Sequence, residues 1–121
     1  MNKVLFIEDD APTSKIYQER FSKIFDVLIA PTGVEGISSA TKEEPDVIIL
    51  DLILAGGLSG FDVLKELKQH PKSKNIPVIV LTNLESQEKI AKDAGAVECL
   101  VKANTSINKV EEIIKKYLQK L

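Results

Sequence analysis

Acidic side chains stand directly after two of the short apolar runs in this sequence. Glu8, Asp9 and Asp10 follow the first run, and Asp51 follows the third. If folding brings these carboxylates together, they repel one another, and burying them without a positive partner is costly. A hard divalent cation with oxygen ligands satisfies such a cluster. Mg2+ fits better than a transition metal, because no histidine or cysteine lies close to these acids in the sequence.

A hydroxyl and an ammonium group occupy the matching places after two further apolar runs. Thr82 follows the run Val78–Leu81, and Lys102 follows the run that ends at Val101. A carboxylate such as Asp51, flanked by Mg2+, a lysine and a hydroxyl, is suited to nucleophilic attack on phosphorus. The two cations neutralise the oxygens of the transferred group while the carboxylate forms an acyl phosphate. The pattern therefore predicts a phosphoryl acceptor.

Five apolar runs must form the elements that position these side chains. They are short, mostly β-branched or leucine, and continuous rather than alternating: Val4–Ile7, Val27–Ala30, Val47–Leu50, Val78–Leu81, and Val97–Val101 with Glu98 interrupting it. Continuous apolar runs are typical of strands that are covered on both faces, as in a parallel sheet packed between helices. We therefore expect five buried strands.

Segments with helical spacing follow the strands. The apolar residues expected on their inner faces are, in chain order, Ile16, Phe21 and Ile24; Val34, Ile37 and Ala40; Phe61, Leu64 and Leu67; Ile90, Ala91 and Ala94; and a regular series from Ile107 to Leu121. Asp10, Thr32 and Ser106 are expected as N-caps or first-turn residues, and Gly95 as a left-handed residue after the fourth helix.

Alternating strands and helices predict an α/β fold. We expect a flavodoxin-like (βα)5 arrangement, doubly wound, with a five-stranded parallel sheet in the order 2-1-3-4-5, because each crossover must be right-handed and helices must cover both faces. The first and third strands are then neighbours. Ligands in such sheets bind beyond the C-terminal strand ends, so Glu8, Asp9 and Asp51 are expected to meet there, opposite Thr82 and Lys102.

Composition bounds the class of protein. A chain of 121 residues with 44% hydrophobic residues is expected to form one domain over residues 1–121. Its single cysteine, Cys99, excludes an intramolecular disulfide and a multi-cysteine zinc cluster, and favours a reducing compartment. The formal charge is −2 with dispersed basic residues, so we expect no direct contact with nucleic acid or membrane. No apolar run approaches a membrane span, and a cytoplasmic location is expected.

Over nearly its whole length the sequence resembles the receiver domain of two-component response regulators, in particular the single-domain, chemotaxis-type receivers. The resemblance is carried by the acidic pair Glu8-Asp9, by Asp51 in Ile-Ile-Leu-Asp-Leu, by Thr82 and Lys102 after their strands, and by Gly60-Phe61-Asp62-Val63-Leu64. Any one of these signals is weak, but all of them in order on the right elements are specific.

The resemblance implies a role for each site residue. Asp51 would receive a phosphoryl group from a histidine kinase or a phosphotransfer protein. Asp9, Asp51 and the backbone carbonyl of Ile53 would ligate Mg2+, and Glu8 would act mainly through water. Thr82 would hydrogen-bond the phosphoryl group, and Lys102 would form an ion pair with it.

Several positions depart from the family pattern. Cys99 stands where the family usually has a tyrosine or phenylalanine that takes part in the switch. Ala103 follows Lys102 in place of a proline, so we expect a trans peptide there, because a non-proline cis bond costs about 3 kcal/mol. Ala55 replaces a proline four residues after Asp51, in a loop with one apparent extra residue, and Asn83 replaces a very small residue.

Two apolar residues flank the expected acceptor site. Ile53 and Leu84 each lie two residues after a site residue, at positions where rapidly hydrolysing receivers tend to carry polar groups that orient water. We therefore expect slow self-dephosphorylation after self-catalysed phosphorylation. Cys99 is expected to be a small buried hydrophobic residue, with redox sensing as the alternative.

The favoured hypothesis is a stand-alone receiver that is not an enzyme and that signals through a protein target of unknown identity. The first alternative is a receiver-like scaffold that binds a partner independently of phosphorylation. A phosphohydrolase is disfavoured, because such enzymes typically carry a second aspartate where this chain has Ile53. A flavin-binding carrier is disfavoured because three acids occupy the place of its phosphate-binding loop.

Overall fold

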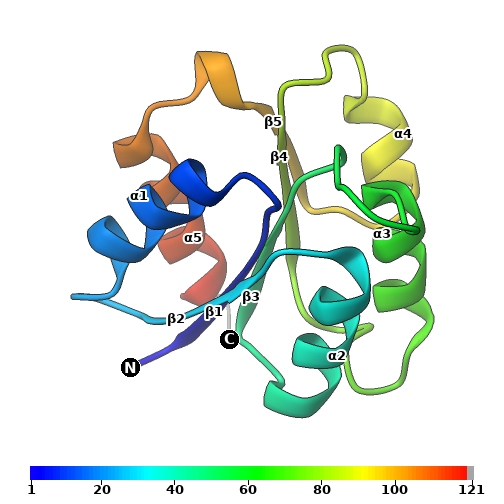
Figure 1. Ribbon diagram of the computed structural model, residues 1–121, viewed down its shortest axis with the longest axis horizontal. Coiled ribbons are helices and arrows are strands. Elements are labelled where there is room, and N and C mark those ends of the chain that lie inside the picture. Colours follow the sequence, from blue (N-terminus) through cyan, green and yellow to red (C-terminus); the bar gives the residue numbers. More distant parts are fainter. Residues whose placement is uncertain (120–121) are drawn as a thin grey trace.

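Five parallel strands form one sheet in the computed structural model, which describes residues 1–119 (Figure 1). Their order is β2-β1-β3-β4-β5, which confirms the predicted flavodoxin-like topology. The strands are β1 (Lys3–Ile7), β2 (Asp26–Ala30), β3 (Val47–Leu50), β4 (Val78–Thr82) and β5 (Glu98–Val101). The helices are α1 (Ala11–Phe21), α2 (Gly33–Glu43), α3 (Gly60–Gln69), α4 (Glu88–Asp93) and α5 (Ile107–Leu118), with a 3-10 turn, η1 (Lys102–Asn104), before α5.

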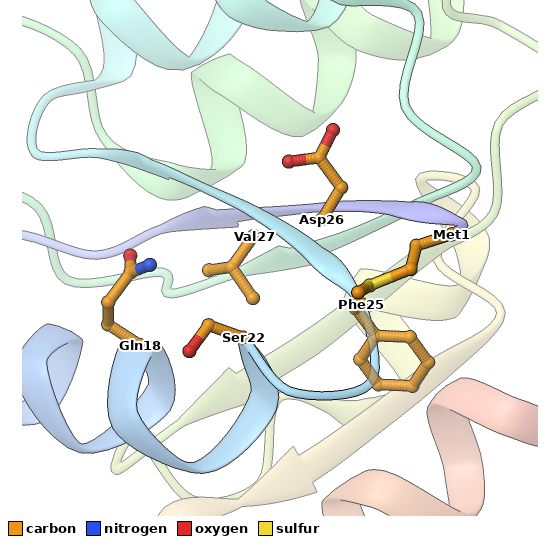
Figure 2. Close-up of a pocket in the computed structure, with 6 residues that line it drawn as sticks. All are labelled: Met1, Gln18, Ser22, Phe25, Asp26 and Val27. Atoms are coloured by element: carbon orange, nitrogen blue, oxygen red, sulfur yellow. The ribbon is translucent and has the colours of Figure 1, made fainter.

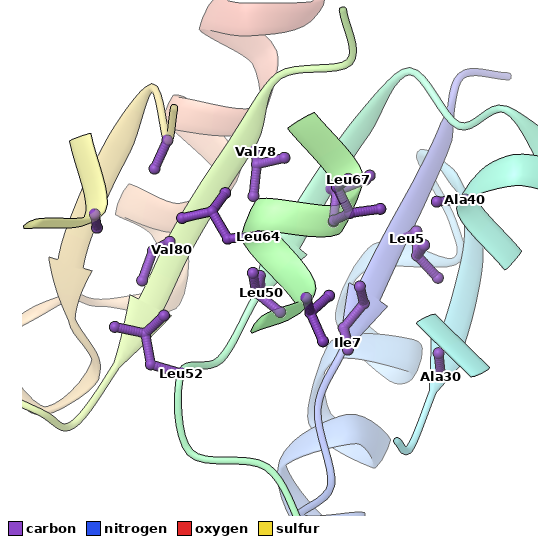
Figure 3. Packing of buried hydrophobic residues seen from close by; sticks show 14 residues of the cluster. Leu5, Ile7, Ala30, Ala40, Leu50, Leu52, Leu64, Leu67, Val78 and Val80 are labelled. Carbon is purple, nitrogen blue, oxygen red and sulfur yellow. The ribbon is translucent and has the colours of Figure 1, made fainter. Parts of the chain in front are cut away.

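Helices cover both faces of the sheet and enclose two apolar clusters. Helices α1 and α5 lie on one face, and α2, α3 and α4 lie on the other (Figure 1). Alternation along β1 divides its side chains between them, since Leu5 and Ile7 join the cluster under α2 and α3 while Val4 and Phe6 join the cluster under α1 and α5. In Figure 3, Leu64 and Leu67 of α3 lie over the strand residues of the first cluster.

The expectation of five buried strands is correct for the three central strands and wrong for the two at the edges. Every residue of β3 and β4 is buried, whereas all of β5 and most of β2 are only half-buried. An edge strand has a neighbour on one side only, and the helices pack over the middle of the sheet. A continuous apolar run does not by itself distinguish these two positions.

Helix faces were predicted less accurately than helix positions. Ile16, Val34 and Ile90 were expected to face inward but are 56%, 64% and 56% exposed. Ile24 lies beyond the end of α1 and is also exposed, and Leu121 lies outside the described residues. Phe21, Ala40 and Ala91 are buried as predicted, and the further buried residues are small or aromatic: Ser14 and Tyr17 on α1, and Gly33 and Gly36 on α2.

Close packing explains why Val34 on α2 is exposed although it was predicted to face inward. A Cβ added to Gly36 would stand 2.6 Å from Cδ1 of Ile7, so this helix lies against β1 where only glycine fits. The apolar Val34 is therefore displaced to the outside, because the buried face of α2 is defined by small residues. Hydrophobicity alone is a poor guide where a helix approaches a sheet this closely.

The predicted capping residues are confirmed. The side chains of Asp10, Thr32 and Ser106 each accept a hydrogen bond from a backbone amide three residues later. Gly95 adopts a φ of +110° directly after α4, as a left-handed terminal residue must. No helix in the described part of the chain has the length and apolar character needed to cross a bilayer.

Candidate metal and phosphoryl-acceptor site

Strand register brings the predicted site residues to one end of the sheet. Ile7 of β1 pairs with Leu50 of β3, so the next residues, Glu8 and Asp51, leave their strands side by side. The amide of Asp51 donates to the carbonyl of Ile7 over 3.1 Å, which fixes this arrangement. Thr82 of β4 pairs with Val101 of β5 in the same way, so that Lys102 follows at the same edge. The convergence predicted from the strand ends is therefore confirmed.

Three carboxylates form a compact cluster at this edge. One oxygen each of Glu8, Asp9 and Asp51 lie within 4.8 Å of one another. Glu8 and Asp51 are buried, with 4% and 6% of their surface exposed, while Asp9 lies open to solvent. Two buried carboxylates this close require a positive partner.

Lys102 supplies that partner. Its Nζ donates to Oδ2 of Asp51 over 2.7 Å and makes a second, close hydrogen bond to Oε1 of Glu8. The ammonium therefore bridges the two buried carboxylates across the end of the sheet. The expected trans peptide before Ala103 is confirmed, as no cis bond occurs in the described residues.

The electrostatics of the site follow from this burial and pairing. Burial raises the pKa of Glu8 above its ordinary value, although hydrogen bonds from Lys102 and the Asp10 amide work in the opposite direction. Burial by itself would lower the pKa of Lys102, but hydrogen bonds and charge from Asp51 and Glu8 outweigh it and raise that pKa. Lys102 is therefore held as a cation wherever the carboxylates are ionised.

Backbone amides of the loop after β3 contact two of the carboxylates. The amide of Ile53 donates to Oδ1 of Asp51 over 3.0 Å, and the amide of Ala55 donates to Oδ2 of Asp9 over 3.0 Å. Sequence reasoning predicted neither of these two contacts, because every residue except proline carries an amide donor. The one available signal was the alanine at a position where the resembling family has proline.

The cleft over the carboxylates has a volume of about 340 Å3. Its lining includes the acidic residues, Lys102 and Asn83, together with Thr13 and Ile53. Oδ1 of Asn83 accepts a hydrogen bond from the amide of Ala103 over 3.1 Å, which ties the loop after β4 to the turn that follows Lys102. Asn83 therefore has a structural partner as well as a place at the cleft.

Thr82 directly precedes Asn83, which lines the cleft, and is itself fully buried. Its Oγ1 accepts a hydrogen bond from the amide of Leu84 over 3.3 Å. Leu84 itself is 39% exposed, and Ile53 on the opposite loop is 50% exposed. The threonine hydroxyl thus contacts its own loop in this structure, and Ile53 is an exposed apolar residue in the lining of the cleft.

A glycine fixes the far end of the loop after β3. Gly60 begins α3, and a Cβ added there would stand 2.3 Å from the carbonyl oxygen of Asp51 and 2.3 Å from Cα of Leu52. The start of α3 therefore packs directly on the backbone that carries Asp51. This close approach is a physical reason for the glycine that opens the Gly60–Leu64 motif.

Cys99 lies on β5 and packs against the first apolar cluster, the one that contains Leu5 and Ile7. It is half-buried rather than buried, and burial raises the pKa of its thiol. A raised pKa leaves little thiolate at neutral pH, which disfavours the redox-sensing alternative. The side chain behaves as a small apolar residue at this position.

The donor set fits a hard divalent cation. All three candidate side-chain ligands are carboxylates, one is open to solvent, and the cleft above them leaves room for retained water. Thiol or imidazole ligands are absent from this cluster, which matches the preference of Mg2+ for oxygen. The residues present can therefore hold the metal predicted from the sequence.

A second hollow, of about 390 Å3, lies at the opposite end of the sheet (Figure 2). It is lined by residues before β1, at the end of α1 and at the start of β2: Met1, Gln18, Ser22, Phe25, Asp26 and Val27. Among these side chains only Asp26 is ionisable. The hollow therefore lacks the convergent polar groups of the carboxylate cleft.

Comparison with protein families gives one match that covers most of the chain. Residues 4–115 match the family model described as the response regulator receiver domain. Protein PilH of Pseudomonas aeruginosa is 32% identical over 102 residues, which cover 81% of this chain and 84% of that protein. "Probable transcriptional regulator ycf27" of Porphyridium aerugineum is 35% identical over 103 residues, or 83% of this chain. The chain spans only 41% of the length of that relative.

Solved structures show the same fold. The receiver domain of the Francisella response regulator 1452 superposes with a TM-score of 0.90 at 25% identity, covering 99% of this chain and 98% of that chain. The receiver domain of the sensor histidine kinase PA1611 from Pseudomonas aeruginosa has a TM-score of 0.86 at 20% identity, covering 98% of each chain. That structure has a magnesium ion coordinated in its active site cleft.

Proposed function

The chain belongs to the response regulator receiver domain family of two-component systems, and on this premise we propose that Asp51 is its phosphoryl acceptor. The observation that carries the proposal is the bridge from Lys102 to the two buried carboxylates, Asp51 and Glu8. The bridge places a cation against the acceptor oxygen at the floor of an open cleft. This arrangement can stabilise the charge that accumulates during attack on phosphorus.

We propose that Asp9, Asp51 and the backbone carbonyl of Ile53 hold Mg2+, with Glu8 contributing through water. The support is the carboxylate cluster, its oxygen-only character, and the magnesium ion in the cleft of the PA1611 receiver. A bound Mg2+ supplies positive charge beside the oxygens of an incoming phosphoryl group. Glu8 is more deeply buried than Asp9 and already pairs with Lys102, which suits an indirect role.

Phosphorylation in this scheme is a displacement at phosphorus. An oxygen of Asp51 forms a new P–O bond as the bond from phosphorus to the donor nitrogen breaks. The nitrogen keeps the bonding electron pair and takes a proton from the solvent. Lys102 pairs with the transferred oxygens. Thr82 donates its hydroxyl hydrogen to them, and the hydrogen bond that its Oγ1 accepts from the Leu84 amide does not use this hydrogen.

The donor and output are assigned by chemical class. Receiver domains interact with histidine kinases or phosphotransfer proteins, and we propose such a donor for this chain. We further propose that residues 1–121 form one receiver domain located in the cytoplasm, and that its target is a protein rather than nucleic acid or a membrane. The scaffold alternative is less favoured, because the phosphorylation cluster is intact at Asp51, Glu8 and Lys102.

Apolar residues beside the cleft support slow loss of the phosphoryl group. Ile53 lines the cleft and Leu84 lies two residues after Thr82; both are substantially exposed, and neither offers a side-chain group that can orient a hydrolytic water. We propose that the protein catalyses its own phosphorylation from a small donor and then dephosphorylates slowly. It acts as a phosphoacceptor and not as an enzyme that turns over phosphate esters.

Intact-mass spectrometry after incubation with acetyl phosphate and Mg2+ tests the proposal. We expect a gain of one phosphoryl group in the wild type and none in Asp51→Asn. Asp46→Asn is the matched control, because Asp46 is an aspartate near the opposite end of the sheet that accepts from the Lys3 amide. The proposal is overturned if the wild type gains no mass, or if Asp51→Asn gains as much as the control.

A further inference from the structure

The loop after β3, residues 51–59, contacts two proposed metal ligands through its backbone. Two alternate amides, those of Ile53 and Ala55, donate to Asp51 and Asp9, each over 3.0 Å. The carbonyl of Ile53, itself a proposed ligand, belongs to the same short segment. Residues 53–55 therefore connect Asp51, which follows β3, with Asp9, which lies shortly after β1.

From this geometry we infer that the backbone amide of Ala55 is a positioning group for the proposed metal ligand Asp9. The inference rests on the proposed Mg2+ site. Asp9 is the one exposed member of the cluster, so packing does not fix its side chain. The Ala55 amide donates a hydrogen bond to Oδ2 of Asp9, and in the described structure this bond holds the Asp9 carboxylate toward Asp51.

The two oxygens of Asp9 allow this contact and metal ligation together. In this inference Oδ1 serves as the ligand atom, while Oδ2 accepts from Ala55. A donor that holds the second oxygen of a ligating carboxylate fixes the orientation of the first. The amide thus pre-organises Asp9 for metal without competing for the ligating oxygen.

Flanking residues make residues 53–55 a distinct unit within the loop. Gly60 anchors the far end against the backbone of Asp51 and Leu52. Between that anchor and Ala55 stand Gly56, with a φ of +95°, and Gly57, and a Cβ at either position would meet nothing within 4 Å. The hydrogen bonds to Asp51 and Asp9 therefore hold the segment 53–55 against the cleft, while a side chain at either of the two following glycines would enter open space.

The position of the donor makes the inference sharply testable. Proline has no amide hydrogen, so Ala55→Pro removes the contact to Asp9 without altering any proposed ligand. Ala55→Gly keeps the amide while increasing the freedom of the loop. Gly57→Ala reduces that freedom two residues away and also keeps the amide of Ala55. The three variants separate loss of the donor from a change in loop flexibility.

The first measurement does not involve metal. Amide hydrogen exchange at Ala55, followed by NMR without Mg2+, should be slower in the wild type and in Asp10→Asn than in Asp9→Ala. Asp10→Asn is the matched control, since it removes a neighbouring charge but keeps an oxygen for the N-cap of α1. Equal exchange rates at Ala55 in all three proteins would overturn the inference, whatever the behaviour toward metal or phosphoryl donors.

The second measurement is Mg2+ affinity by calorimetric titration. Ala55→Pro should bind Mg2+ about tenfold more weakly than the wild type. Loss of a hydrogen-bond partner of a metal ligand typically lowers metal affinity by ~10- to 100-fold, and we expect the lower end of this range. Ala55→Gly and Gly57→Ala should bind within about twofold of the wild type by the same reasoning. Unchanged or tighter binding by Ala55→Pro would overturn the positioning role, whereas absence of Mg2+ binding by the wild type would instead overturn the proposed function.

Discussion

Lys102 and Asp51, which lie 51 residues apart in the sequence, meet at 2.7 Å across the end of the sheet. The same ammonium also contacts Glu8, so one cation balances two buried carboxylates. Removing one member of a buried ion pair is strongly destabilising, because the remaining charge has no partner. Lys102 therefore has a structural role in the metal-free protein as well as its proposed role toward a phosphoryl group.

Lys102→Ala tests this structural role. Without Mg2+, we expect the variant to lose about 3 kcal/mol of unfolding free energy. Mg2+ should stabilise the variant more than the wild type, since it supplies the missing positive charge. Urea unfolding with and without Mg2+ measures both effects. Lys116→Ala, which removes an exposed pair with Glu98, should cost at most about 0.5 kcal/mol and serves as the control. Equal losses in the two variants would contradict the expectation.

Gly60→Ala and Gly57→Ala form a matched pair in the loop after β3. The added methyl group at Gly60 would meet the backbone of Asp51 and Leu52 at 2.3 Å, so we expect a loss of about 2–3 kcal/mol in unfolding free energy. At Gly57 nothing lies within 4 Å, and the change should be neutral or stabilise by about 0.5 kcal/mol. Thermal and urea unfolding compare them, and similar stabilities would show that α3 does not pack on the acceptor backbone as described.

Ile53→Asn addresses the lifetime of the phosphoryl group. We expect the phosphorylated wild type to persist for minutes after the donor is removed, because the exposed Ile53 cannot orient water. The side-chain amide of asparagine can orient water, so the substitution should shorten the lifetime about tenfold. This effect is smaller than the ~10²–10⁴-fold rate increase that a general base provides. Intact mass followed over time gives both rates. Ile53→Leu should leave the lifetime unchanged, and loss of the wild-type phosphoryl group within seconds would refute the prediction.

Tyr117 and Glu98 link α5 to β5 through a pair of groups that titrate at opposite ends of the pH range. The Tyr117 hydroxyl donates to Oε2 of Glu98 over 2.6 Å, and this contact, with burial, raises the pKa of Tyr117 to about 12. Burial alone would raise the pKa of Glu98, but the Tyr117 hydroxyl and Lys116 lower it below its ordinary value.

The two shifts predict the pH dependence of stability. The lowered pKa of Glu98 stabilises the folded protein at pH values above the unfolded pKa near 4.5. This contribution is lost as pH falls through the folded pKa of Glu98. The raised pKa of Tyr117 stabilises the folded protein at pH values below the unfolded pKa near 10. This contribution is lost as pH rises toward the folded pKa of about 12. Tyr117→Phe should therefore be less stable than the wild type by about 1 kcal/mol near neutrality. Unfolding measured across pH should show the difference shrinking at both extremes, and a constant difference would exclude the linkage.

Cys99 should react slowly with alkylating reagents. Its thiol is half-buried on β5, and burial raises its pKa, so the thiolate is scarce near neutral pH. We expect iodoacetamide to modify the native protein several-fold more slowly than the urea-unfolded chain at the same pH. Mass spectrometry of timed samples gives the two rates. Faster modification of the native protein would restore the redox-sensing alternative.

The sequence alone determined the fold and the strand ends that carry the candidate site residues. Five short apolar runs, the last interrupted by Glu98, predicted strands packed between helices, and the acids, the threonine and the lysine each followed such a run. Because parallel strands end at one edge, their order was enough to place Glu8, Asp51 and Lys102 together. Local signals were equally reliable at helix ends, since capping depends on one side chain and an amide three residues away.

The faces of the helices and the details of the loops were decided only by tertiary structure. The exposed Val34 and the buried Gly36 reflect how closely α2 approaches Ile7, a distance that no single helix encodes. The Ala55 amide is chemically the same as other backbone amides, and it became a partner of Asp9 only where the loop after β3 passes over the end of β1. Side-chain types are written in the sequence, but contacts between distant backbone and side-chain groups depend on the packing of the whole sheet.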